Sequence, residues 1–207
     1  MDTAVWTVVH QERAALLHDL EALPLPQWQT PTACVGWDVH DVVAHLIDSA
    51  RTTRLGFARD MIAARFDFDR QNAAGIARER RADPRETLVA LRSVVSLTNT
   101  PPAPPATRLV EAFVHGEDIR RAVGLSGDYP AGPVSRALAF QLRTTVKMGG
   151  GKERARGLHL VTDDGTLDHG TGPAVQGSVL ALLLAVSGRP TQPGELTGPG
   201  AEQLASR

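Results

Sequence analysis

The stretch LVEAFVHGEDI, residues 109–119, decides how the chain is interpreted. Glu111 and His115 lie in it four residues apart, which is about one helical turn, so their side chains share one face of a helix. The sequence therefore predicts a core helix that carries a carboxylate and an imidazole in register. Such a pair is a candidate for metal binding, and an exposed or ion-paired Glu–His pair is the alternative. The apolar residues around it recur at the spacings of three and four that are typical of a helix with one buried face: Leu109, Val110, Phe113 and Val114.

Composition and charge narrow the classes of function. With 42% hydrophobic and 22% charged residues, the 207-residue chain is long enough to bury a core in one domain, or in one domain with a small appendage. The formal net charge is −1 and both signs are mixed along the chain, which argues against nucleic acid as a partner. The longest apolar run, VLALLLAV at 179–186, is too short to cross a bilayer, and MDTAVWTVVHQERA lacks the basic-then-apolar pattern of a signal sequence. We expect no membrane partner and a cytoplasmic location.

The chain has a single cysteine, Cys34, which excludes an internal disulfide and a cysteine-based zinc cage. A metal would therefore need histidine and carboxylate ligands. Cys34 lies in a loop-like segment between two tryptophans, WQTPTACVGWD at 28–38. We interpret it as a small packed residue, with a reactive thiol as the alternative.

Helical periodicity dominates the first 150 residues. A first helix is predicted over 3–23 and ends at the prolines of LPLP, and a second, long helix begins after Asp38 and runs to about Phe66. Proline and glycine signals bound the helices that follow. These are predicted within 67–81 and over 84–97, 106–123 and 132–148.

The pattern changes after the glycines at 149–151. GLHLVTDDGTLDHG, residues 157–170, predicts two short strands around an Asp-Gly turn, and SVLALLLAVSG, residues 178–188, predicts an apolar helix that ends at Gly188. We therefore expect a mainly α protein, with a helical bundle over 1–150 and a small α+β region over 151–207.

His45 is a third candidate ligand. In DVVAHLI, residues 41–47, it lies on the side of its predicted helix that faces the core, where a hydrogen-bonded core histidine is the alternative. A buried carboxylate without a partner is costly, and a divalent metal shared with two imidazoles removes that cost. Two histidines and one carboxylate also leave coordination positions open, as a catalytic site requires. Helical bundles commonly build metal sites from facing helices in this way.

Three further residues are candidates around this site. Asp118 follows His115 by three residues and is either the acceptor of the second N–H of that imidazole or a solvated carboxylate. Arg189, in SGRP, is a candidate clamp for a substrate carboxylate, or a cation at the end of a helix. Arg51 follows His45 on the predicted second helix and is either a substrate-binding residue at the mouth of a pocket or an exposed, salt-bridged arginine.

Three motifs in order, PTACVGWDVHDVVAHL, EAFVHGEDIRRAVG and GPAVQGSVLALLLAVSGRP, resemble one known family. They are similar to the actinobacterial maleylpyruvate isomerase family of mycothiol-dependent enzymes, within the DinB-like superfamily. The resemblance covers nearly the whole chain. It implies a DinB-like four-helix bundle with a metal bound by a histidine of the second helix and by the Glu and His of an E-x3-H helix. These positions are His45, Glu111 and His115 here.

The resemblance also implies a chemistry. A divalent metal, zinc first and nickel or another metal otherwise, would hold mycothiol as a thiolate that attacks a small electrophilic substrate. If the thiol leaves the product again, the enzyme is an isomerase. If the thiol remains attached to the product, the enzyme is an S-transferase. The tail after residue 150 is shorter than the sterol-carrier-like domain of the better-understood isomerase, so the electrophile stays open.

Two other functions compete with this one. The first is a non-catalytic or stress-associated DinB-like protein that binds a metal or another ligand, and the second is a metal-dependent hydrolase. The expected partners are a small-molecule thiol and an electrophile. The sequence is also compatible with a homodimer.

Overall fold

The structure is a computed structural model, and it describes residues 3–207. By its internal contacts the chain divides into two compact units, one up to Gly127 and one from Asp128 to Arg207. We call them the N-terminal unit and the C-terminal unit. The N-terminal unit contains α1 (Thr3–Glu21), η1 (Leu25–Gln29), α2 (Val39–Arg51), α3 (Arg54–Ala63), α4 (Phe68–Glu79), α5 (Pro84–Val94) and α6 (Ala106–Ala122).

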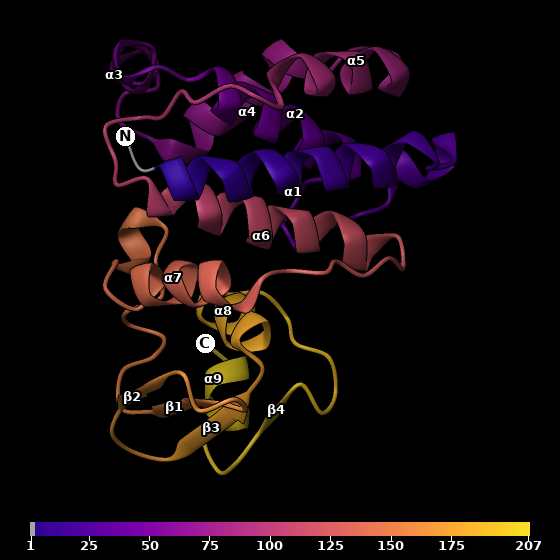
Figure 1. The fold of residues 1–207 in the computed structure, drawn as a ribbon. Helices are drawn as coiled ribbons and strands as arrows, with labels where there is room; N and C mark the ends of the chain where they lie inside the picture. The colour runs from indigo at the N-terminus through magenta and orange to yellow at the C-terminus, as the bar shows by residue number, and fades with distance from the viewer. Residues whose placement is uncertain (1–2) are drawn as a thin grey trace. The chain divides into compact units, whose positions relative to one another are not determined.

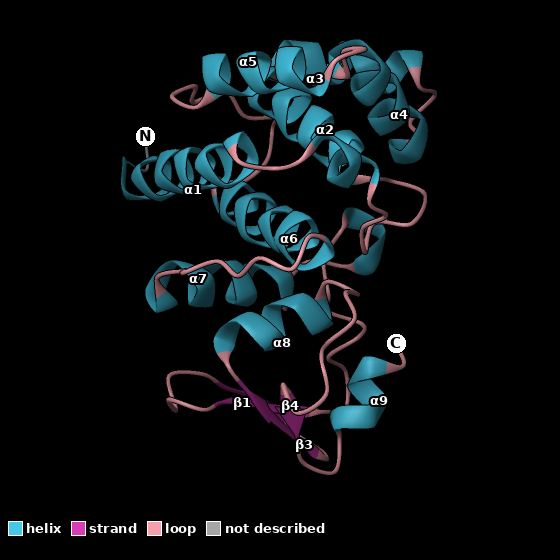
Figure 2. Ribbon diagram, turned by 90° about the vertical axis from the view of Figure 1, so that its right-hand side faces the viewer, coloured by secondary structure: helices cyan, strands magenta, loops and turns pink. Residues whose placement is uncertain are grey.

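The N-terminal unit is built on a four-helix bundle of α1, α2, α5 and α6 (Figure 1). Both α1 and α2 pack against α5 and α6, while α4 lies along the other side of α2 and α3 packs on α4 (Figure 2). The predicted mainly α fold with a four-helix bundle is confirmed. Apolar side chains of α2 lie at the centre of the core and are fully buried: Val39, Val42, Val43, Ile47 and Ala50.

A capping box fixes the start of α2. The Asp38 side chain accepts a hydrogen bond from the backbone N–H of Asp41 at 2.8 Å, and the Asp41 carboxylate accepts one from the N–H of Asp38 at 3.2 Å. Arg80, which follows α4, donates to both carboxylates, at 2.7 and 2.6 Å. The beginning of the helix that carries His45 is therefore held by local and long-range contacts.

The single long helix predicted from Asp38 to about Phe66 is wrong, because the chain leaves the helix after Arg51. Thr52 has extended backbone angles, and its hydroxyl donates to the carbonyl of Asp48 at 2.8 Å. Thr53 then caps α3 by accepting from the N–H of Gly56 at 3.1 Å. Threonine hydroxyls bond to nearby backbone groups and so compete with a continuous helix, which is the reason for the break.

The C-terminal unit is a small α+β structure. Its elements are α7 (Ala131–Gln141), η2 (Val146–Met148), β1 (His159–Thr162), β2 (Asp168–Gly170), β3 (Ala174–Gly177), α8 (Val179–Val186), β4 (Leu196–Thr197) and α9 (Ala201–Ala205). The predicted hairpin is present as β1 and β2, which pair antiparallel around Gly165. β3 pairs parallel to β1 and antiparallel to β4, so the sheet order is β2-β1-β3-β4. The strands β3 and β4 and the helix α9 were not predicted.

The division between the units differs from the boundary expected near residue 150. The helix predicted over 132–148 was assigned to the bundle, whereas α7 packs against α8 within the C-terminal unit. The reason lies in α8, which is almost wholly apolar and is buried over most of its length, so it needs a covering helix. Val134, Ala137 and Leu138 of α7 are fully buried.

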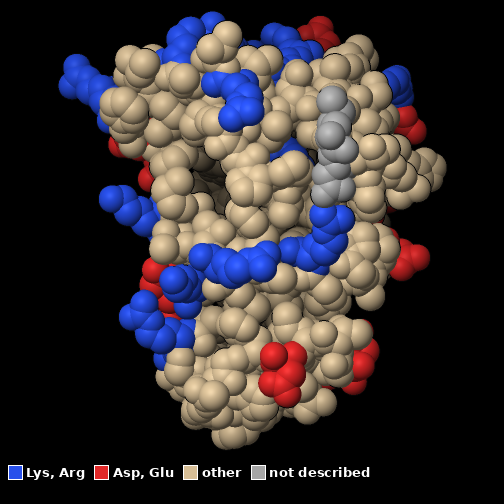
Figure 3. Space-filling view, turned by 60° about the vertical axis from the view of Figure 1, so that its left-hand side comes forward, with Lys and Arg blue, Asp and Glu red and all other residues tan. Residues whose placement is uncertain are grey.

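The surface carries charges of both signs. On the face shown in Figure 3, basic and acidic side chains both occur and other residues make up most of the area, in keeping with the net charge of −1. In the part of the chain that the structure describes, no helix is both long and apolar enough to cross a bilayer.

Candidate metal centre

Two of the predicted ligands, His45 of α2 and His115 of α6, face each other in the bundle. Their ring centroids are 4.9 Å apart, with the rings nearly perpendicular. The indole of Trp37, from the loop before α2, lies against both rings, 5.1 Å from His45 and 6.4 Å from His115. Facing helices therefore bring together two imidazoles that are 70 residues apart in sequence, and an aromatic side chain packs against both.

The third predicted ligand, Glu111, is deeply buried, with 11% of its side chain exposed. Its Oε2 lies 2.5 Å from Nη1 of Arg108, and the same Nη1 donates to the hydroxyl of Ser49 at 2.5 Å. Its Oε1 is buried and has no hydrogen-bond partner among residues 3–207. Burial opposes ionisation, but Arg108, His45, Ser49 and His115 together outweigh it and lower the pKa of Glu111, so the carboxylate is charged.

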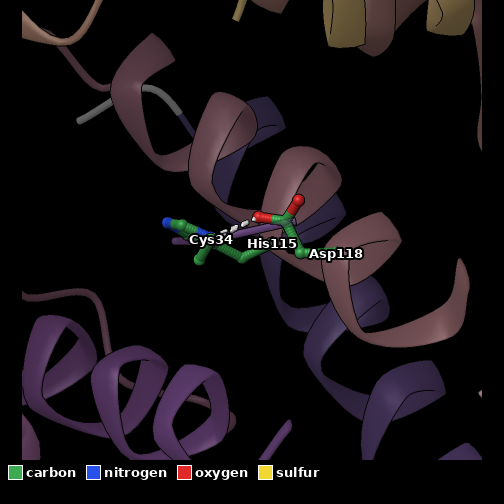
Figure 4. A group of neighbouring side chains, drawn as sticks. All are labelled: Cys34, His115 and Asp118. Carbon is green, nitrogen blue, oxygen red and sulfur yellow. Dashed lines mark hydrogen bonds and ion pairs between the residues drawn. The ribbon is translucent and has the colours of Figure 1, made fainter. Parts of the chain in front are cut away.

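A second set of contacts holds the other side of His115 (Figure 4). Its Nδ1 lies 2.9 Å from Oδ2 of Asp118, on the same helix. The Cys34 thiol comes from the loop before α2, donates to the same Oδ2 at 3.0 Å and lies 3.7 Å from Nδ1. With Nδ1 directed to Asp118, Nε2 is the nitrogen of His115 that remains for a metal.

The two imidazoles differ in their affinity for a proton. Burial, with His115 as a second cause, lowers the pKa of His45 to about 3, so this ring is neutral at pH 7. Burial also disfavours the charged form of His115, but the hydrogen bonds with Asp118 and Cys34 outweigh it and raise the pKa of His115 to about 9. His45 is therefore ready to donate a lone pair, whereas His115 must release a proton before it can bind a metal.

The side chains around Glu111 offer the kinds of donor atom that a divalent cation takes. A buried, charged carboxylate with one oxygen unpartnered and a neutral imidazole beside a second one supply the oxygen and nitrogen donors that zinc and similar metals take. In the described part of the chain, however, the group whose ligand atoms lie close enough together to hold a metal, within 4.8 Å of one another, is Cys34, His115 and Asp118. The ligand set His45, Glu111 and His115 stays a prediction.

Arg51 and Arg189 have other partners in the structure. Arg51 donates to Glu79 at 2.6 Å and to Ser93 at 3.3 Å, which is the salt-bridged alternative. It also lines an open cavity of about 530 Å³ between α2, α3 and α4, whose lining includes none of the three predicted ligands. Arg189 lies in the C-terminal unit just after α8, where its Nη1 donates to the carbonyl of Ser187 at 3.4 Å.

Three residues of the site were missed in the sequence. Arg108 precedes Glu111 by three residues, a spacing that places both side chains on one face of a helix. The sequence therefore contained enough information to predict this ion pair. Trp37 and Cys34 were interpreted as packing residues. The packing of Cys34 is correct, since it is 9% exposed, but its contact with Asp118 joins positions 84 residues apart and has no local signal.

Comparisons with known proteins agree with this fold. Residues 9–103 match the family described as the mycothiol maleylpyruvate isomerase N-terminal domain, a range that contains His45 but ends before α6. Two solved structures resemble the chain, one of the mycothiol-dependent maleylpyruvate isomerase and one of a histidine-to-alanine mutant of it. Each has a TM-score of 0.67 and 15% identity, and covers 96% of this chain and 93% of its own, which shows a shared fold. No curated protein matches the chain.

Proposed function

Because residues 9–103 match the N-terminal domain of the mycothiol maleylpyruvate isomerase family, we propose that the chain is a metal- and mycothiol-dependent isomerase or S-transferase. The first of the three sequence motifs, PTACVGWDVHDVVAHL, lies inside this range, and the two solved structures that share the fold are of a mycothiol-dependent maleylpyruvate isomerase and its mutant. The observation that carries the proposal is Glu111, a charged carboxylate in the bundle core with one oxygen unpartnered and two imidazoles close by. Such a carboxylate favours a bound cation.

We assign His45, Glu111 and Nε2 of His115 as the metal ligands. A bound divalent ion, zinc first, supplies a Lewis acid that keeps a small thiol deprotonated at neutral pH. His45 contributes a ring that is already neutral, and Trp37 restricts the movement of both rings by packing against them. The ligands stand on two helices of one bundle, which favours a fixed geometry over one set by loops.

Asp118 is proposed to support His115 from behind. By accepting from Nδ1–H, its carboxylate fixes the ring orientation and keeps Nε2 free. Cys34 then has the role of a second hydrogen-bond donor to Asp118 rather than of a nucleophile, because its thiol is buried and already donates. The reactive sulfur is supplied by the small-molecule thiol.

The proposed partners are a low-molecular-weight thiol and a small electrophile in the cytoplasm. We retain Arg189 as the proposed clamp for an acidic electrophile, because a guanidinium binds a carboxylate through two parallel hydrogen bonds. Arg51 is the weaker proposal, since Glu79 already neutralises it.

Metal content tests the proposed site directly. Purified wild type should hold about one equivalent of divalent metal by mass spectrometry, and His45→Ala, Glu111→Ala and His115→Ala should each lose most of it. His159→Ala is the matched control, because His159 lies on β1 of the C-terminal unit and pairs with Asp168 at 2.7 Å. Full occupancy in all three ligand variants would refute the site.

Turnover then separates the functions. The metal-loaded protein should convert electrophiles only when mycothiol is added. Turnover without any thiol would favour the hydrolase instead. No turnover, together with a large loss of thermal stability when the metal is removed, would favour a binding protein with a structural metal.

A further inference from the structure

Arg108 joins the two helices of the proposed site at the level of the ligands. Its Nη1 lies 2.5 Å from Oε2 of Glu111 on α6 and 2.5 Å from the hydroxyl of Ser49 on α2. Ser49 follows His45 by four residues and therefore lies on the same face of α2, one turn further along. The guanidinium thus ties the carboxylate to the helix face that carries His45, and with 9% of its side chain exposed it has little freedom to move.

The contact between Arg108 and Glu111 is incomplete in a specific way. An Arg–carboxylate pair that serves stability alone gains most by using both oxygens in two parallel hydrogen bonds. Here the guanidinium contacts Oε2, while Oε1 is buried without a partner in the described chain. A buried acceptor that is left unpaired loses the hydrogen bonds it had with water, so this arrangement is unfavourable for a purely structural pair. It suits a carboxylate that is held by one oxygen and offers the other to a cation.

We propose that Arg108 is a positioning residue, which holds Glu111 through Oε2 and Ser49 and so presents Oε1 to the metal. The role rests on the proposed function, because it presumes that Glu111 is a ligand. A bound cation and a guanidinium repel each other, so the positioning effect must exceed this repulsion for Arg108 to favour metal binding. Affinity measurements on variants with and without the positive charge separate the two effects.

The experiment compares Zn²⁺ affinity in competition with a chromophoric chelator, together with the visible absorption spectrum of the Co²⁺-loaded protein. Arg108→Met removes the guanidinium but keeps an unbranched side chain, and we expect about a 10- to 100-fold weaker Kd and an altered Co²⁺ spectrum. Arg108→Lys keeps the charge without the planar fork and should recover part of the affinity. Ser49→Ala removes the anchor on α2 and should weaken binding by a smaller factor.

Arg120→Met is the matched control. Arg120 is also a buried arginine of α6, 3% exposed, and it pairs with Asp19 of α1 at 2.7 Å, so its loss should lower stability in a similar way. The Zn²⁺ affinity and the Co²⁺ spectrum of this variant should match those of the wild type. Circular dichroism establishes that each variant is folded, and if Arg108→Met is not, Arg108→Lys alone decides by its affinity and spectrum.

The outcomes separate the two proposals. Suppose that the wild type binds Zn²⁺ and that the folded Arg108 variants have the same affinity and an unchanged Co²⁺ spectrum. This result overturns the positioning role and leaves the metal site intact. Tighter binding in Arg108→Met than in the wild type also overturns it, because repulsion then dominates. Wild-type protein that binds no divalent metal overturns the metal site and the role of Arg108 together.

Discussion

Cys34 and Asp118 are 84 residues apart in the chain, yet the thiol of one donates to the carboxylate of the other at 3.0 Å. The same oxygen lies 2.9 Å from Nδ1 of His115, so one carboxylate links the loop before α2 to a predicted ligand on α6. Substitution of Asp118 therefore tests how the ring of His115 is oriented.

Asp118→Asn should weaken metal binding by about 10- to 100-fold, because an amide of the same shape accepts more weakly and turns either a donor or an acceptor toward Nδ1. The Zn²⁺ dissociation constant at pH 7.5 checks this expectation. Asp128→Asn, at the first residue of the C-terminal unit, is the control. An Asp118 variant with wild-type affinity would remove this residue from the site.

Cys34→Ala should retain turnover with added mycothiol to within a few-fold, because the proposed reactive sulfur is not in the protein. The substitution deletes a buried thiol, so we expect stability to fall by about 1 kcal/mol in a urea titration. Complete loss of turnover in a variant that still binds metal would instead identify Cys34 as the nucleophile.

Removal of the metal with a strong chelator should abolish thiol binding and leave most of the helix content in place. The core around α2 is made of apolar side chains buried on the four bundle helices, and its burial does not depend on a metal. Far-UV circular dichroism and calorimetric titration with mycothiol, before and after chelation, measure both effects. Unfolding of the bundle on chelation would mean that the metal is structural.

Asp38→Asn should lower the stability of the protein at neutral pH. In acid, the variant and the wild type should be about equally stable. Burial opposes ionisation of Asp38, but the hydrogen bonds from Arg80 and from Asp41 outweigh it and lower its pKa. A lowered carboxyl pKa stabilises the fold above the unfolded value of about 3.9, and this stabilisation is lost as the pH falls through the folded value. The free energies of unfolding from urea titrations should therefore differ at pH 7 and converge as the pH falls through the lowered pKa of Asp38. A difference that does not change with pH would exclude the ionic contribution.

Arg189→Ala should raise the KM for an acidic electrophile without changing metal content, if its guanidinium binds a substrate carboxylate. Steady-state kinetics with a matched pair of acidic and neutral electrophiles test this. Arg143→Ala removes another arginine of the C-terminal unit, an exposed one, and should change neither value. Equal kinetics for wild type and Arg189→Ala with the acidic electrophile rule out the clamp.

Local patterns predicted most of the N-terminal helices. The helix predicted over 106–123 is α6, Ala106–Ala122, and the spacing of Glu111 and His115 placed both on one face of it. The meeting of His45 and His115 followed from the core-facing sides of two helices, which periodicity reveals.

Features that depend on contacts between distant segments were not predictable in the same way. The break after Arg51 was hidden because helical periodicity continues across it, while hydroxyl groups at Thr52 and Thr53 decide the local backbone. The packing of α7 on α8 was also hidden, because periodicity shows that a helix has an apolar face but not which neighbour covers it.

The proposed ligands come from the faces of α2 and α6, and no loop carries any of them. A larger ion can therefore be accommodated only if the two helices move apart, and that movement would loosen the packing of Ile47 and Phe113, both fully buried. The proposed site therefore predicts that the preference among metals of different radius depends on the volume of the bundle core. Substitutions such as Ile47→Val, which change no proposed ligand, are then predicted to alter which metal the protein selects.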